Sequence, residues 1–117
     1  MTERDAARTL AHPDPAEIRL EGVLHALGDP LRLSIVRDLA ASGPELGCSA
    51  FDLPVTKSTT THHFRVLRES GVVRQTYRGT TKFNALRRAD LESLFPGLLD
   101  AVLRADRAES ARLAAQV

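Results

Sequence analysis

The stretch from residue 57 to residue 84 restricts the possible folds of this chain more than any other. Its first half starts at Lys57 or Ser58 and predicts an amphipathic helix, because apolar side chains recur on one face at helical spacing. The face expected to be buried carries Thr60, Phe64 and Leu67. Gly71 predicts the end of this helix, since glycine readily adopts the left-handed backbone that terminates helices.

Two short strands are predicted directly after this helix, at Val72–Tyr77 and Thr80–Asn84. A tight turn at Arg78-Gly79 would join them. That turn lacks the Asn-Gly or Asp-Gly signature of the commonest hairpin loops, so its type stays open. A helix followed at once by a basic two-stranded ribbon indicates a module that puts one element into a DNA groove and lays the other along the backbone.

The distribution of charge points in the same direction. Residues 57–88 contain eight basic residues and one acid, Glu69, which gives a net charge of +7. The rest of the chain has a net charge of −6, so the total of +1 conceals a strongly polarised molecule. Segregated positive charge is typical of nucleic-acid-binding surfaces. The alternative explanation is a solvated helix face beside an Arg-rich hairpin.

Helices are also predicted on both sides of this unit. The segments with a helical pattern of apolar residues are Pro15–Leu27, Leu31–Ala41, Arg88–Phe95 and Pro96–Ala115. Asp14 and Asp29 are expected to cap the first two, since a proline follows each of them at the first helical position. The first and last helices have apolar surface that so small a core cannot cover, which predicts packing against a second copy of the chain.

The 117 residues have the length of one ordinary domain. We expect a flexible extension at residues 1–13 and one domain at residues 14–117, because the prolines after His12 end any early helix. Apolar runs fall short of the roughly 20 residues of a membrane span. The charged N-terminus does not resemble a signal peptide. A single cysteine, Cys48, suits a reducing compartment, so a cytoplasmic protein without membrane contact is expected.

Two motifs resemble those of the ArsR/SmtB family of bacterial winged-helix repressors. Residues 26–36, ALGDPLRLSIV, are similar to the family's opening motif L-(A/G)-D-P-x-R-x-x-I-(L/V). Residues 58–73, STTTHHFRVLRESGVV, are similar to its recognition-helix motif S-T-(V/L)-S-H-H-L-x-V-L-(R/K)-x-A-G-(L/I)-(V/I). The two motifs occur in the expected order and spacing, and the resemblance covers about residues 15–104.

This resemblance implies a mainly α-helical winged helix-turn-helix protein with a small β-hairpin wing, dimerised through its first and last helices. A member of the family would act as a homodimeric, sequence-specific repressor of transcription. It would bind an inverted-repeat operator in double-stranded DNA and release it on binding a small-molecule inducer.

Metal sensing is common in this family, but the chain departs from both usual site patterns. The cysteine pair of the family motif E-L-C-x-C-D-L is reduced here to Cys48 alone. The other pattern uses Asp and His on the last helix, and residues 88–117 contain no His and no Cys. Soft and borderline metals need several thiolate or imidazole ligands. We therefore predict no metal and no cofactor, and interpret Cys48 as a buried thiol.

The polar face of the predicted recognition helix carries the candidate base contacts. Ser58, His62 and Arg65 are predicted to meet base edges, because their side chains match hydrogen-bonding groups of the major groove. Thr59 and Thr61 flank them and are predicted to reach bases or phosphates. The side chains predicted to contact phosphates are all cationic: Lys57, Arg68, Arg74, Arg78 and Lys82.

Several alternatives accompany these assignments. Arg78 at the hairpin tip could instead enter a minor groove. His63 is interpreted as a packed residue rather than a DNA contact. Catalysis is not predicted, because His62 and His63 point about 100° apart on a helix and no acid is spaced to orient either ring. The competing function is a winged-helix protein-interaction module that binds another protein through its basic face, without sequence-specific DNA binding.

Overall fold

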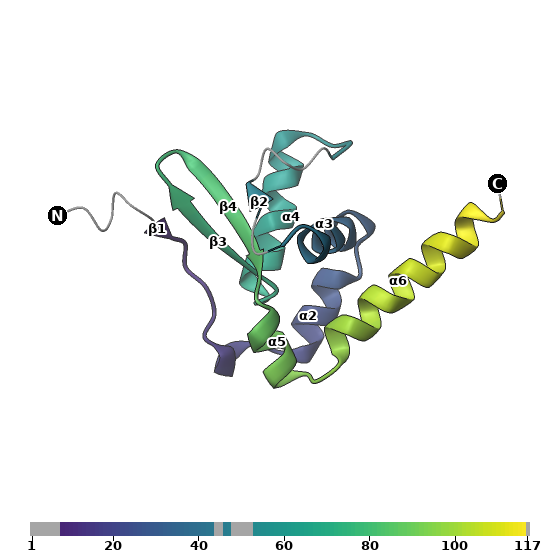
Figure 1. Cartoon of the computed structure of the whole chain (residues 1–117). Coiled ribbons are helices and arrows are strands. Elements are labelled where there is room, and N and C mark those ends of the chain that lie inside the picture. The colour runs from purple at the N-terminus through teal and green to yellow at the C-terminus, as the bar shows by residue number, and fades with distance from the viewer. Residues whose placement is uncertain (1–7, 44–45, 48–52, 117) are drawn as a thin grey trace. The chain divides into compact units, whose positions relative to one another are not determined.

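The computed structural model describes residues 8–43, 46–47 and 53–116. The chain divides into two compact units, Met1–Arg87 and Arg88–Val117. The first contains the predicted recognition helix and hairpin (Figure 1). Its helices are the short 3₁₀ element η1 (Pro15–Glu17), α2 (Leu20–Leu27), α3 (Pro30–Ala41) and α4 (Lys57–Glu69).

The helix expected at residues 15–27 is instead divided into η1 and α2. Ile18 separates them with an extended backbone (φ −77°, ψ 125°), and its side chain is buried. That side chain lies against Gly71, where an added Cβ atom would come within 2.5 Å of the Ile18 Cδ1 atom. The single helix predicted for this segment was therefore wrong, because a tertiary contact overrides the helical pattern.

Helices α3 and α4 confirm the predicted local signals. The Asp29 carboxylate accepts hydrogen bonds from the backbone N–H groups of Leu31 (2.8 Å) and Arg32 (3.1 Å), which caps α3. Gly71 ends α4 with a positive φ of 88°. Its N–H donates to the carbonyl of Arg68, and the next N–H donates to that of Leu67, which is the Schellman arrangement.

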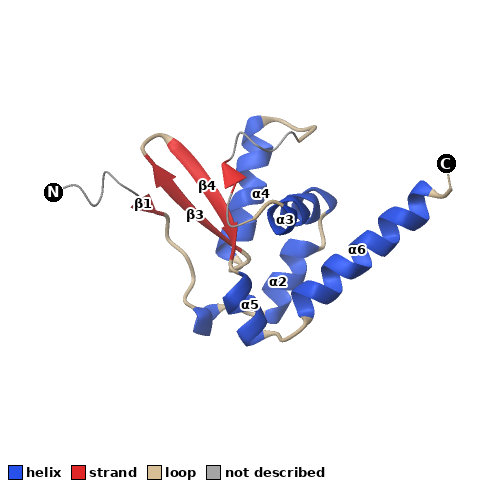
Figure 2. Cartoon of the chain, in the orientation of Figure 1, coloured by secondary structure: helices blue, strands red, loops and turns tan. Residues whose placement is uncertain are grey.

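A four-stranded antiparallel sheet has the order β1-β3-β4-β2 (Figure 2). Its strands are β1 (Arg8–Thr9), β2 (Leu46–Gly47), β3 (Val73–Arg78) and β4 (Thr81–Leu86). Arg78 pairs with Thr81, so the hairpin loop is Gly79-Thr80 and lies one residue beyond the predicted turn. Gly79 has a φ of 63°, and a glycine at the first loop position is typical of a type II′ turn.

Strands β1 and β2 were not expected. Arg8 pairs with Tyr77 and Thr9 with Thr76, so the described part of the predicted extension lies along the hairpin. The flexibility of residues 1–13 and the domain boundary after residue 13 stay predictions. Leu46 opens β2 and pairs with Asn84 on the opposite edge of the hairpin.

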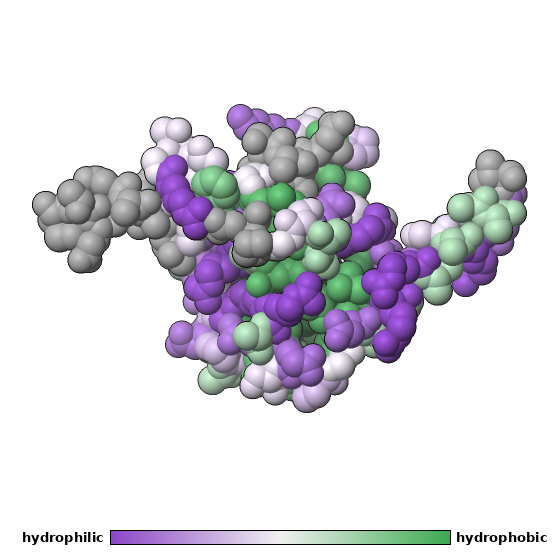
Figure 3. Space-filling model, in the orientation of Figure 1, coloured by the Kyte–Doolittle hydropathy of each residue, from purple (hydrophilic) through white to green (hydrophobic). Residues whose placement is uncertain are grey.

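The core of the first unit is formed by apolar side chains of α2, α3, α4 and the start of β3. The hydrophobic residues buried there are Ile18, Val23, Ala26, Leu27, Ile35, Val36, Leu39, Phe64, Leu67, Val72 and Val73. Burying a side chain of this kind stabilises a fold by about 1.5–3 kcal/mol. The core therefore fixes α4 by one face. Hydrophilic residues are widespread on the molecular surface that Figure 3 shows.

The second unit consists of α5 (Arg88–Leu94) and α6 (Leu98–Ala114). Gly97, with a φ of 80°, caps α6, so this helix starts two residues after the predicted Pro96. The buried apolar residues of this unit are Leu91, Leu99 and Leu103. Among the described residues, no helix combines the length and apolar character that crossing a membrane requires.

Candidate nucleic-acid interface

Helix α4 turns one face toward the core and the other toward solvent. His63, Phe64 and Leu67 are buried on the inner face. The exposed residues include six of the seven predicted contacts of this helix: Lys57, Ser58, Thr59, Thr61, His62 and Arg65. Thr60, expected on the core face, is only half-buried, and its hydroxyl donates to the carbonyl of Thr56 at 3.1 Å. The helix thus presents a contiguous polar surface of the kind that can face bases.

Hydroxyl groups form a local network at the start of α4. Thr56 Oγ1 caps the helix by accepting from the Thr59 N–H at 3.3 Å, and it donates to Thr59 Oγ1 at 2.9 Å. Thr61 Oγ1 donates to the carbonyl of Lys57 at 3.0 Å. A hydroxyl has one proton to donate and two lone pairs. In this arrangement Thr61 offers an outside partner only lone pairs, whereas Thr59 keeps its proton for donation.

The two strongest candidates for base reading contact each other on the exposed face. Arg65 Nη2 lies 3.4 Å from His62 Nδ1, one helical turn away. A guanidinium group has no acceptor, so the arginine donates and the imidazole accepts. This contact restrains a long side chain before any partner binds. The contact of Arg65 with a base edge stays a prediction.

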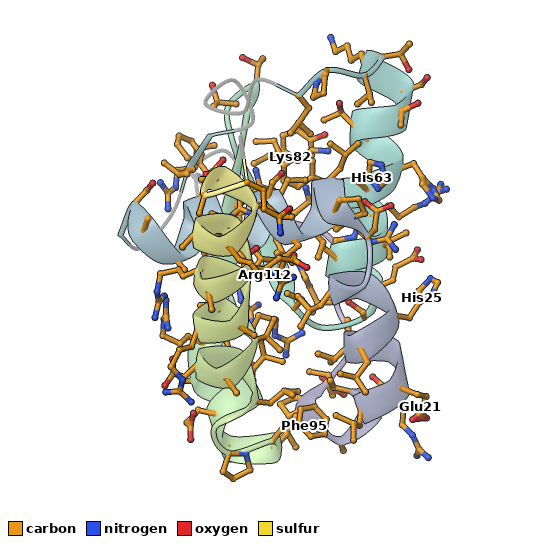
Figure 4. The ribbon with its side chains drawn as sticks, turned by 90° about the vertical axis from the view of Figure 1, so that its right-hand side faces the viewer. Glu21, His25, His63, Lys82, Phe95 and Arg112 are labelled. Atoms are coloured by element: carbon orange, nitrogen blue, oxygen red, sulfur yellow. The ribbon has the colours of Figure 1, made fainter. Side chains whose placement is uncertain are left out.

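A buried arginine anchors α4 from its inner side. Arg32 and His63 are each only 7% exposed, and Arg32 Nη1 donates to His63 Nδ1 at 3.2 Å. Figure 4 labels His63 on the recognition helix. The same guanidinium donates from Nε to the Ala26 carbonyl at 2.8 Å and from Nη2 to the His25 carbonyl at 3.2 Å. One side chain of α3 thus ties the end of α2 to the recognition helix. The expectation that His63 is packed and hydrogen-bonded is confirmed.

Asp29 completes the charge arrangement around this anchor. Its Oδ1 atom lies 4.0 Å from His63 Nδ1. Burial alone would raise the pKa of Asp29, but hydrogen bonds from the backbone of Arg32 and Leu31, together with the charge of Arg32, hold that pKa below its usual value. The carboxylate that caps α3 therefore also stabilises the buried cation of Arg32.

The wing, the β3–β4 hairpin, carries three predicted contacts. Arg74 and Arg78 are exposed, and Lys82 is half-buried. The guanidinium of Arg78 lies over the Phe83 ring at 4.8 Å from its centroid, and Lys82 Nζ lies 5.3 Å from that of Tyr77. Cations at these distances are attracted to an aromatic face. Two of the three wing cations are therefore held on the hairpin rather than extended freely into solvent.

Arg68 differs from the other predicted contacts because it is half-buried and turned toward the wing. Its Nη1 donates to Gln75 Oε1 at 2.7 Å. Gln75 Nε2 in turn donates to Asn84 Oδ1 at 2.7 Å, and both amide residues are fully buried. Sequence reasoning missed Gln75 and Asn84, although polar residues at inward positions of two neighbouring strands were a usable signal. The phosphate contact of Arg68 stays a prediction.

No metal-binding cluster is found in the described part of the chain. Within residues 8–43, 46–47 and 53–116, no three His, Cys, Asp or Glu side chains are grouped so that they could hold an ion. Cys48 lies outside the described residues, and its interpretation as a buried thiol stays a prediction.

Sequence relatives agree with this arrangement. No protein-family model matches the chain. It is 35% identical over 80 residues to the uncharacterised HTH-type transcriptional regulator YceK of Bacillus subtilis, which covers 67% of this chain and 80% of that protein. It is 36% identical over 62 residues to the uncharacterised HTH-type transcriptional regulator MJ1325 of Methanocaldococcus jannaschii, which covers 52% of this chain and 70% of that protein.

A solved structure supports the fold. The crystal structure of the ArsR family transcriptional regulator RHA00566 matches with a TM-score of 0.57 and 22% identity, over 80% of this chain and 93% of that one. The fold is thus a winged helix like that of this ArsR family regulator, which confirms the fold that the sequence motifs implied. The chain belongs to the helix-turn-helix transcriptional regulators.

Proposed function

We propose that this regulator is a homodimeric, cytoplasmic repressor that binds an inverted-repeat operator in double-stranded DNA and is released by a small-molecule inducer. The observation that carries the proposal is the exposed polar face of α4, which has six predicted contact residues above a buried anchor. No catalytic step and no cofactor enter this function.

Each part of the interface has a separate role in the proposal. Ser58, His62 and Arg65 read base edges in the major groove, because they stand on the outward face of an anchored helix. Thr59 and Thr61 reach bases or phosphates beside them. Cations of α4 and the wing bind the phosphate backbone and set affinity rather than sequence preference: Lys57, Arg68, Arg74, Arg78 and Lys82.

Exposed apolar side chains on the first and last long helices support a dimer. Leu20 and Leu24 of α2 are 44% and 47% exposed, and Leu113 of α6 is 51% exposed. Covering such side chains with a second copy removes apolar area from water. A two-fold dimer presents two recognition helices to successive major grooves, which is why an inverted-repeat operator is expected.

Selection of DNA by the purified protein tests this function. Duplexes enriched from a random library would be sequenced, and binding of the best duplex and of a scrambled duplex would be measured at increasing salt. We expect an inverted repeat, a preference for the selected duplex, and a steep loss of affinity with salt as counterions are released. Equal affinity for the selected and scrambled duplexes would contradict the proposal.

The inducer part of the proposal has its own test. Small molecules from the host cell would be screened for their ability to release the bound duplex. We expect one chemical class of molecule to release the duplex. The same molecule should change the thermal stability of the protein only as much as an ordinary bound ligand does. Operator binding that no metabolite fraction alters would remove the inducer from the proposal.

A further inference from the structure

The segment that precedes η1 is attached along the wing, and we call residues 8–13 the N-terminal strap. Strand β1 opens the strap and pairs with β3. Beyond it, the Leu10 N–H donates to the carbonyl of Gln75 at 3.3 Å, and the Gln75 N–H donates to His12 Nε2 at 2.9 Å. At its end, Arg87 Nη1 donates to the carbonyl of Pro13 at 2.8 Å. The strap is thus held to the hairpin and, at its end, to the residue that follows the hairpin.

Gln75 is the junction between the strap, the wing and the recognition helix. Its backbone bonds to the strap through Leu10 and His12, while its side chain accepts from Arg68 of α4 and donates to Asn84 of β4. Gln75 is fully buried, and buried polar groups are almost always kept hydrogen-bonded. Loss of the hydrogen bond that His12 accepts would therefore affect Gln75, the same residue that links the wing to α4.

His12 can hold this junction only in one protonation state. Its Nε2 atom accepts the Gln75 N–H, so this nitrogen must carry no proton. Burial of the ring and the charge of Arg74 hold the pKa of His12 below its ordinary value of 6.5; Arg87 and Arg68 act in the same direction, and a backbone hydrogen bond involving Leu10 opposes them. The charged groups that act on the ring are therefore all cationic.

The direction of the pH effect follows from this environment. A detached strap would bind a proton at His12 more readily than the attached strap does, since attachment lowers the pKa of this ring. The contribution of the bond is therefore complete above pH 6.5 and declines as the pH falls below that value. Acid should loosen the strap, and neutral or basic pH should keep it in place.

We infer that His12 is a positioning residue for DNA binding: through Gln75 it holds the wing in register with the recognition helix. The inference rests on the proposed function, because it concerns the affinity of α4 and the wing for one duplex. It goes beyond that function because the affinity for DNA would then depend on the pH and on His12, which lies outside both α4 and the wing.

Three variants separate this role from general effects of histidine titration. His12→Gln offers an amide oxygen in place of Nε2 and does not titrate, whereas His12→Ala offers no acceptor. His25→Gln is the matched control, because His25 is exposed on α2 and its side chain has no part in the proposed interface. Duplex binding would be measured by fluorescence anisotropy for each variant between about pH 8 and about pH 5, the range over which histidines titrate.

At the upper end of that range, His12→Ala should weaken duplex binding about three- to tenfold, the scale of one hydrogen bond. His12→Gln should bind as the unaltered protein does. Towards the acid end, the unaltered protein and His25→Gln should both lose affinity relative to His12→Gln. Comparison with His12→Gln at each pH removes the contribution of the other histidines, including His62 on α4.

A measurement without DNA keeps the inference independent of binding. The chain has one tyrosine, Tyr77 on the wing, and no tryptophan, so its intrinsic fluorescence reports the hairpin. We expect His12→Ala to change Tyr77 fluorescence and to speed hydrogen exchange at the Gln75 amide, while His12→Gln preserves both. Unchanged exchange at Gln75 in His12→Ala would overturn the positioning role.

Failure of the inference and failure of the proposed function have different outcomes. If the unaltered protein binds a selected duplex and both His12 variants match it at every pH, the inference is wrong and the proposed function stands. If the unaltered protein binds no duplex even at low salt, the proposed function is wrong, and the role of His12 in DNA binding is wrong with it.

Discussion

The recognition helix and the wing are attached to the molecule in contrasting ways. Helix α4 is fixed through the buried side chains of Phe64 and Leu67 and by the hydrogen bond between Arg32 and His63. The wing starts at the buried Val73, but beyond that residue its links to the strap and to α4 are hydrogen bonds that meet at Gln75. Apolar packing permits few alternative arrangements, whereas a polar junction can respond to pH and to neighbouring charges. We infer that the helix supplies sequence preference and the wing an adjustable affinity.

The largest effect should come from the apolar attachment of α4. Leu67 is completely buried, and Leu67→Ala should lower the free energy of unfolding by about 2–5 kcal/mol, because it leaves a cavity. Urea denaturation followed by circular dichroism measures this change. Val55→Ala, at an exposed position, is the control and should change it by less than about 0.5 kcal/mol. Similar values for the two variants would contradict the described packing.

Removal of the buried arginine should have the next largest effect. Arg32→Met keeps the length of the side chain but leaves His63 and the carbonyls of Ala26 and His25 without this donor. The expected loss of stability is about 1–3 kcal/mol, the scale of a buried polar group deprived of its partner. We expect a lower melting temperature and weaker binding to the selected duplex. A variant as stable as the unaltered protein would show that this anchor does not hold α4.

Loss of a base contact should affect the selected sequence alone. Arg65→Ala should weaken binding to the selected duplex by about 1–3 kcal/mol and leave scrambled DNA nearly unaffected, because the guanidinium would no longer match a base edge. Titrations of both duplexes at one salt concentration measure the difference. Equal losses on both duplexes would mean that Arg65 contacts the backbone and reads no base.

The smallest effect should come from the wing. Arg78→Ala should weaken binding to all duplexes to a similar extent and lower the slope of the salt dependence by about one unit, as expected for one lost phosphate contact. Arg112→Ala on α6, outside the proposed interface, is the matched control. A loss confined to AT-rich duplexes would instead place Arg78 in a minor groove, since a narrow groove attracts arginine.

Local signals in the sequence were sufficient for the elements that carry the proposed contacts. Asp29, Gly71 and the periodicity of α4 act over a few residues, so α3, α4 and the hairpin could be predicted. The predicted turn, Arg78-Gly79, differs by one residue from the observed loop, Gly79-Thr80, because a glycine can occupy more than one turn position.

The features that escaped prediction depend on residues far apart in the sequence. His12 and Gln75 are 63 positions apart, and no local pattern connects them. The break at Ile18 likewise depends on Gly71, which only the folded chain brings close. Arg68 has the charge expected of a phosphate contact, yet its orientation is set by the buried side-chain amide of Gln75 on β3. The inward positions of Gln75 and Asn84 could have been noticed in the sequence, but which groups they bond becomes visible only once the strands are in register.

Hydroxyl-radical footprinting of a selected duplex tests the central claim most directly, namely that paired copies of α4 and the wing bind one duplex. We expect two protected segments centred about 10 base pairs apart, or a multiple of that spacing, because two-fold-related recognition helices enter successive major grooves. Arg65→Ala should erase the protection on the selected duplex at protein concentrations where Arg112→Ala preserves it. A single protected segment, or uniform protection that ignores sequence, would contradict the claim.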